Sequence, residues 1–71
     1  MTFRDFIIDI EDIIGRSLSQ ESRDRIYEVA YTPYILATAF IDYIESEVAY
    51  HSLSDDQRQA VLAAWSAYMA S

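Results

Sequence analysis

The sequence predicts an all-α fold, a small bundle of about four helices. Apolar residues recur at intervals of three and four positions along the whole chain, and the strict alternation that indicates a strand is absent. Serine or threonine stands at, or directly before, each expected helix start, as N-cap chemistry favours. The expected helices span residues 3–14, 19–31, 33–50 and 55–70, and the 71 residues make a single domain, 1–71.

The first helix is predicted from an apolar stripe with acidic residues on the opposite face. Thr2 is expected to cap its N-terminus, and Gly15 stands where a left-handed residue commonly ends a helix. The stripe consists of Phe3, Phe6, Ile7, Ile10, Ile13 and Ile14.

The second helix, 19–31, opens at Ser19, whose side chain is expected to cap it. Glu21 lies in its first turn, where the helix dipole favours an acid, and forms an i, i+4 pair with Arg25. Thr32 and Pro33 then favour a break, because proline disfavours helical backbone for the residue before it. Thr32 is the expected cap of the third helix; a kinked continuous helix is the alternative.

The fourth helix has the clearest start. Ser54 and Gln57 have the spacing of a capping box, in which each side chain bonds the other residue's backbone N–H. Its expected apolar stripe consists of Val61, Leu62, Trp65, Tyr68 and Met69.

A short similarity relates the two halves of the chain. The pattern FI followed by IE at residues 6–11 recurs at 40–45, an offset of 34, and SLS at 17–19 recurs at 52–54, an offset of 35. Each SLS is followed by an acidic residue and an arginine at the same positions. Two pseudo-repeated helical hairpins would produce this pattern. Independent use of the same serine-cap chemistry is the alternative, and the sequence leaves both open.

The chain is strongly acidic. Twelve Asp and Glu residues against five basic residues, all arginine, give a net charge of −7. This surplus disfavours direct binding to nucleic-acid phosphates or anionic membranes. The longest uncharged stretches, 29–41 and 59–71, are shorter than the roughly 20 residues of a membrane span, and the first residues lack a secretion signal. We therefore expect a cytoplasmic protein with no direct contact to membranes or nucleic acid.

Residues that support catalysis or metal binding are few. The chain has no cysteine, and its single glycine excludes a glycine-rich phosphate loop. His51 is the only histidine; Glu47, Asp55 and Asp56 lie near it in sequence, but the spacing matches no metal motif, and a helix-end histidine explains it equally well. Carboxylate pairs fall on expected exposed faces, without the cleft that separates catalytic pKa values. We expect no enzyme activity, no cofactor and no metal.

Two groups of apolar residues are candidate partner-binding sites. On a regular third helix, Leu36, Tyr43 and Tyr50 form a ridge at seven-residue spacing, and tyrosine ridges are typical of protein interfaces. Coverage of this ridge by helix one or four within the monomer is the alternative. Ile8 is a second candidate, because it falls within the polar face of the first helix. A further face of the fourth helix holds only small residues, Ala60, Ala63, Ala64 and Ala67.

The acidic residues of the first helix are a third candidate. Asp5, Asp9 and Asp12 fall along one side, with about 6 Å of helical rise between the first two. This is similar to the spacing of phosphates along a nucleic-acid strand. A solvated face that keeps the protein soluble is the alternative.

Together these features predict a non-enzymatic protein-binding module that regulates or inhibits a larger protein. Phage-encoded antagonists of host defence or regulatory proteins share this size and charge, which is an analogy and not a motif match. Two alternatives stay open. One is an acidic nucleic-acid mimic that blocks a nucleic-acid-binding protein; the other is a structural homo-oligomerisation unit, such as a homodimer.

Overall fold

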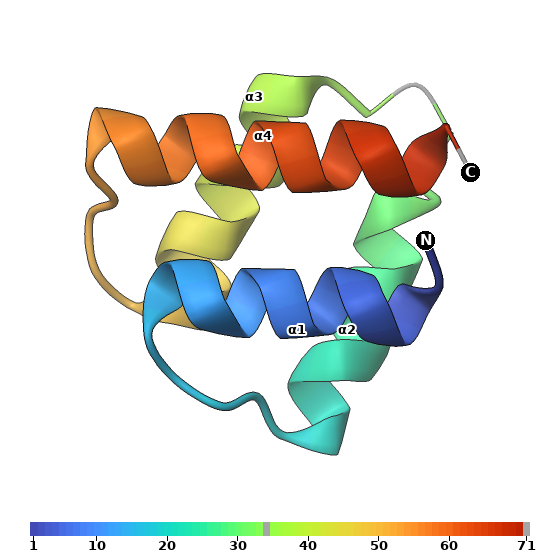
Figure 1. The fold of residues 1–71 in the computed structure, drawn as a ribbon, viewed down its shortest axis with the longest axis horizontal. Helices are drawn as coiled ribbons and strands as arrows, with labels where there is room; N and C mark the ends of the chain where they lie inside the picture. Colours follow the sequence, from blue (N-terminus) through green and yellow to red (C-terminus); the bar gives the residue numbers. More distant parts are fainter. Residues whose placement is uncertain (34, 71) are drawn as a thin grey trace.

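The computed structural model describes residues 1–33 and 35–70. Its elements are α1 (Phe3–Ile14), α2 (Gln20–Ala30), α3 (Ala37–Tyr43), the π-helix η1 (Ile44–Ala49) and α4 (Asp55–Met69), and the described residues form no strand. The all-α prediction is confirmed. Helices α1 and α4 lie side by side and run in opposite directions, while α2 and the α3–η1 segment cross behind them (Figure 1).

Helix α1 begins and ends where the sequence predicts. Thr2 Oγ1 accepts the backbone N–H of Asp5 at 3.2 Å, and the Asp5 carboxylate accepts the Thr2 N–H at 3.3 Å. Gly15 adopts a φ of 75° and donates its N–H to the Glu11 carbonyl at 2.9 Å. Local chemistry therefore determines both ends of this helix.

Helix α2 is one residue shorter at each end than the predicted 19–31. Ser19 is the cap, so it precedes the helix, and its hydroxyl accepts the Ser22 N–H at 3.1 Å. The predicted pair between Glu21 and Arg25 is present at 2.6 Å. Tyr31, with φ −100° and ψ 7°, already belongs to the following turn.

The predicted third helix, 33–50, begins too early. Thr32 is not its cap: the Thr32 hydroxyl donates to the Glu28 carbonyl at 3.0 Å, so this side chain is bonded to the end of α2. Leu36 takes the N-cap position in extended backbone, without a side-chain hydrogen bond. Pro33 therefore lies in the connecting turn, and position 34 lies outside the described residues.

The third segment also does not continue as an α-helix. Its last six residues, Ile44–Ala49, form a π-helix, and Tyr50 ends it in the left-handed region with φ 59°. A π-helix adds one residue per turn, so the angular spacing of a regular α-helix does not hold past Tyr43.

Helix α4 begins with the predicted capping box. Ser54 Oγ accepts the Gln57 N–H at 3.1 Å, and Gln57 Oε1 accepts the Ser54 N–H at 2.9 Å. Its predicted apolar stripe is wrong at Met69, which is 44% exposed. Ala64, which the sequence places on a further face of small residues, is buried, because part of this alanine face lies beside α1.

Aromatic rings join the two front helices to each other and to α3. Phe6 stacks on Tyr68 with ring centroids 5.0 Å apart, and Phe40 stacks on Trp65 at 5.2 Å. Phe6 and Phe40 occupy equivalent positions in the two similar halves of the sequence. Both are fully buried, and their ring centroids lie 6.1 Å apart. The largest fully buried side chains are Phe6, Ile10, Ile26, Phe40, Ile44 and Val61.

The turns of the two halves are built alike. Glu11 Oε2 accepts the Leu18 N–H at 2.7 Å, and Glu45 Oε2 accepts the Leu53 N–H at 2.8 Å. These glutamates are related by the offset of 34 and these leucines by the offset of 35. The extra residue of the second half lies within η1, between Glu45 and Tyr50. The shared contacts favour two pseudo-repeated hairpins over independent capping.

Candidate functional site

The predicted ridge of Leu36, Tyr43 and Tyr50 does not lie on one helix. Leu36 precedes α3 and Tyr50 follows η1, and their side chains are 70% and 67% exposed. The seven-residue spacing therefore loses its geometric basis. Both residues remain exposed apolar surface, at opposite ends of the segment.

Tyr43 is half-buried and packs against the core. Burial raises the pKa of its hydroxyl, and the charge of Arg25 on α2 partly opposes this effect. Glu28, Glu47 and Tyr50 raise the same pKa further. Tyr43 is therefore partly covered within the monomer, and Arg25 and Glu28 place it near α2, whereas the alternative had named helix one or four as the cover.

Tyr50 contacts the turn of the first hairpin. The Arg16 guanidinium lies over its ring, with the central carbon 5.4 Å from the ring centroid. A cation placed over an aromatic face at this distance is favourable. The exposed Tyr50 ring therefore joins the two turns to each other.

The three acidic residues of α1 differ in their surroundings. Asp5 is exposed, but its carboxylate belongs to the α1 capping box. Asp9 is half-buried and Asp12 exposed, and both border a groove of about 430 Å³ between α1 and α4. Ala60, Ala63 and Ala67 line the same groove from α4.

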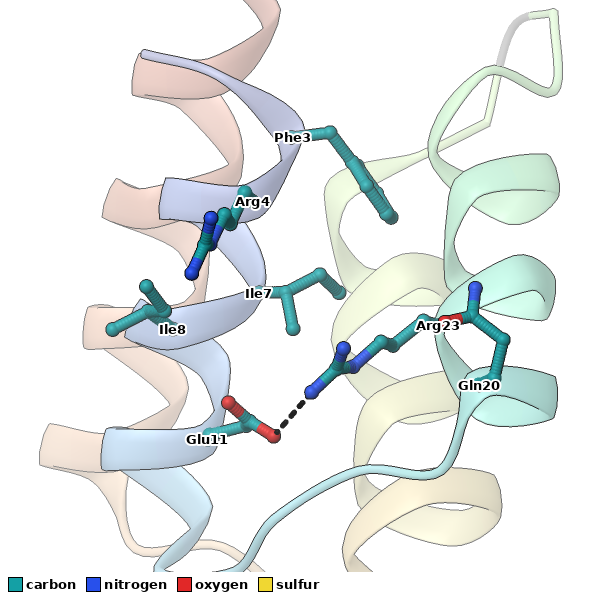
Figure 2. Close-up of a pocket in the computed structure, with 7 residues that line it drawn as sticks. All are labelled: Phe3, Arg4, Ile7, Ile8, Glu11, Gln20 and Arg23. Carbon is teal, nitrogen blue, oxygen red and sulfur yellow. Dashed lines mark hydrogen bonds and ion pairs between the residues drawn. The ribbon is translucent and has the colours of Figure 1, made fainter.

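Ile8 lies at a different groove, between α1 and α2. Its side chain is 45% exposed, and the groove has a volume of about 370 Å³. Phe3 and Ile7 provide further apolar lining, as Figure 2 shows. The remaining lining residues are polar: Arg4, Glu11, Gln20 and Arg23.

Not all polar groups of this groove are satisfied. Glu11 already accepts the Leu18 N–H, and the Gln20 amide donates to Asp24 at 2.9 Å. The Arg23 guanidinium makes one long hydrogen bond, from Nη2 to Glu11 Oε2 at 3.5 Å (Figure 2). Its Nε is buried, and it has no partner within residues 1–33 and 35–70.

Arg4 is the second cation of the groove. The ion pairs of the described chain involve Arg23, Arg25 and Arg58, and none involves Arg4. The sequence pattern points to Ile8 but to neither Arg4 nor Arg23. The internal similarity held a signal for Arg23, because its equivalent is Arg58 while Ile8 is equivalent to an aspartate, Asp42.

His51 shows no metal-binding arrangement. It is exposed, and its Nδ1 lies 3.0 Å from the Ser52 carbonyl oxygen. In the part of the chain that the structure describes, no three His, Cys, Asp or Glu side chains gather as a metal ion requires. Likewise, none of the described helices is long and apolar enough to cross a membrane.

The chain was compared with protein-family models, with curated proteins and with solved structures. None of the three comparisons yields a match.

Proposed function

We propose that the protein is a non-enzymatic binding module that regulates or inhibits a larger protein, and that the α1–α2 groove receives this partner. One observation carries the proposal: Ile8 is exposed at the edge of a groove whose apolar lining continues to Phe3 and Ile7. An apolar anchor beside a few polar groups is the usual composition of a binding hot spot.

The charge distribution supports this assignment. A net charge of −7 accelerates encounter with a basic partner surface, and the exposed Asp5 and Asp12 lie on the same helix as Ile8. The acidic residues therefore steer the partner, while Ile8 holds it after contact.

Affinity capture from a lysate of the source cell tests the proposal. The wild-type protein, Ile8→Glu and Leu36→Glu serve as baits, with folding of each verified by circular dichroism. A partner retained by wild type and Leu36→Glu through a high-salt wash, but lost by Ile8→Glu, is the expected result. Loss by Leu36→Glu with retention by Ile8→Glu would place the interface at the start of α3 and refute the groove.

The acidic face of α1 supports a second candidate function, nucleic-acid mimicry. Asp5 and Asp12 are exposed on one side of α1, and Asp9 lies between them at the edge of the other groove. A triple Asp→Asn variant at these positions should then lose a nucleic-acid-binding partner that is also released by salt. Under the groove proposal the same variant slows association and leaves the complex stable to salt.

A further inference from the structure

The two hairpins use their equivalent arginines differently. Arg58 donates from Nη1 to Glu45 at 3.3 Å and from Nη2 to Asp42 at 3.1 Å. Among the described residues, Arg23 bonds only to the glutamate of its own hairpin, Glu11, at 3.5 Å. Arg58 therefore has two carboxylates, whereas Arg23 has one.

The first hairpin has no counterpart of the Asp42 carboxylate, and the difference lies at one position of the sequence. Ile8 precedes Glu11 by three positions, just as Asp42 precedes Glu45, so Ile8 occupies the position of Asp42 in the first hairpin. The guanidinium of Arg23 consequently retains unused donors, and 41% of its side-chain surface is exposed. Guanidinium groups in proteins favour paired hydrogen bonds to a carboxylate.

The groove is lined by more arginines than carboxylates, although the whole chain is acidic. Arg4 and Arg23 line it against a single carboxylate, Glu11, while the whole chain carries −7. Figure 2 shows Arg4 beside Ile8 on α1, with Arg23 extending from α2 toward Glu11. A ligand that fits must bring negative charge to the arginines and apolar surface to Ile8.

We propose that the α1–α2 groove binds an aspartate or glutamate side chain of the partner protein, flanked by aliphatic residues, and that this carboxylate pairs with Arg23 as Asp42 pairs with Arg58. Aliphatic neighbours of the carboxylate contact Ile8 and the groove lining. Arg4 adds positive charge at the same entrance. This inference rests on the proposed function, because it names the chemistry that the partner presents to the groove.

Nuclear magnetic resonance of the full chain, labelled with ¹⁵N, provides the test. The buried Nε–H of Arg23 gives a side-chain signal that reports on the guanidinium. The probes are the peptide acetyl-Leu-Glu-Leu-amide, its matched peptide acetyl-Leu-Gln-Leu-amide, and inorganic phosphate. We expect a saturable shift of the Arg23 signal with the glutamate peptide, and binding weaker by about tenfold with the glutamine peptide.

Two variants localise the binding. Arg23→Lys should lower the affinity for the glutamate peptide several-fold, because a lysine ammonium lacks the planar pair of donors. Arg25→Lys is the matched control: Arg25 pairs with Glu21 outside the groove, and the variant should bind like wild type. Backbone signals of each variant show that its fold is retained.

Four outcomes would overturn the inference. They are no shift at millimolar glutamate peptide, equal shifts with both peptides, an equal response to phosphate, and a shift that follows protein concentration without peptide. The last would identify a second copy as the occupant. Equal binding of both peptides, with loss of the cellular partner by Ile8→Glu, would refute the carboxylate and leave the proposed function intact. If the glutamate peptide binds but Ile8→Glu does not affect capture of the cellular partner, the proposed function is refuted and the carboxylate-binding groove remains.

Discussion

The carboxylate of Glu45 accepts the backbone N–H of Leu53 at 2.8 Å, across the turn between η1 and α4. Glu11 makes the same bond to Leu18 at 2.7 Å in the first hairpin. A turn amide that is partly shielded from water needs such an acceptor. The side chains of these two glutamates connect each first helix to the loop that follows it.

Glu45→Ala is therefore expected to lower the free energy of unfolding by about 2 kcal/mol, since Leu53 loses its acceptor and Arg58 loses one of two carboxylates. Glu11→Ala should have a comparable effect. Urea denaturation followed by circular dichroism measures both. Glu28→Ala, at an exposed position, is the control and should change stability by less than about 0.5 kcal/mol. Equal effects of all three substitutions would contradict a structural role of the turn bonds.

The π-helix is expected to be removable. Glu47 is exposed within η1. In the first hairpin the left-handed residue Gly15 follows Glu11 by four positions, and deletion of Glu47 would give Tyr50 the same spacing from Glu45. The deletion variant should fold, with a free energy of unfolding within about 1 kcal/mol of wild type. Deletion of the exposed Asp12 in α1 is the control, because it rotates the residues that follow away from the core and should unfold the protein. Thermal denaturation compares the two, and unfolding by both deletions would contradict the repeat.

The left-handed residue that ends each first helix gives a third prediction. Gly15 has φ 75° and Tyr50 has φ 59°, and only glycine adopts this region without a steric penalty. Tyr50→Gly should be more stable than Tyr50→Ala by about 1 kcal/mol, because both remove the ring that contacts Arg16 and only glycine relieves the backbone. Gly15→Ala should lower the free energy of unfolding by a similar amount. A Cβ at position 15 would meet no atom within 4 Å, so this loss would be conformational. Urea denaturation of the three variants measures these differences, and equal stability of the two Tyr50 variants would contradict the backbone penalty.

Helix ends that depend on neighbouring residues were predictable from the sequence. Thr2, Ser19 and Ser54 each accept an N–H three residues ahead, so their capping needs no tertiary contact. The start of the third helix was not predictable in this way. Thr32 carries a cap-forming hydroxyl, but it bonds backward to Glu28, and both directions are open to a threonine at a helix end.

The candidate site depended more on tertiary structure. Ile8 was identified because its place on a helix follows from the positions of its neighbours. Arg23 lies twelve residues from Glu11 on another helix, so only the packing of α2 beside α1 brings its guanidinium to the groove. The prediction that Leu36, Tyr43 and Tyr50 form one ridge was wrong for a related reason. The residue inserted in η1 alters the angular spacing on which this prediction depended.

The comparison of the two hairpins predicts the effect of giving Arg23 a second carboxylate. Ile8→Asp should allow Arg23 to pair with the introduced carboxylate as well as with Glu11, as Arg58 pairs with Asp42 and Glu45. An exposed ion pair contributes little, so stability should change by less than about 1 kcal/mol. Binding of the partner should be lost, because the new carboxylate occupies the Arg23 donors. Ile8→Asn, of matched size without the charge, should retain part of the affinity in isothermal titration calorimetry; equal loss in both variants would indicate that only the isoleucine side chain matters.

Alkaline pH is expected to destabilise the protein through Tyr68. Burial, together with the 2.5 Å hydrogen bond to the Tyr31 hydroxyl, raises the pKa of Tyr68 from 10 to about 12. The unfolded chain ionises near pH 10, so this contribution is complete below pH 10 and is lost as the pH rises toward 12. The complete loss, reached at about pH 12, amounts to about 3 kcal/mol. Urea denaturation between pH 8 and 11 should show wild type approaching Tyr68→Phe in stability as the pH rises; a difference that stays constant would show that the Tyr68 pKa is the same in the folded and unfolded states.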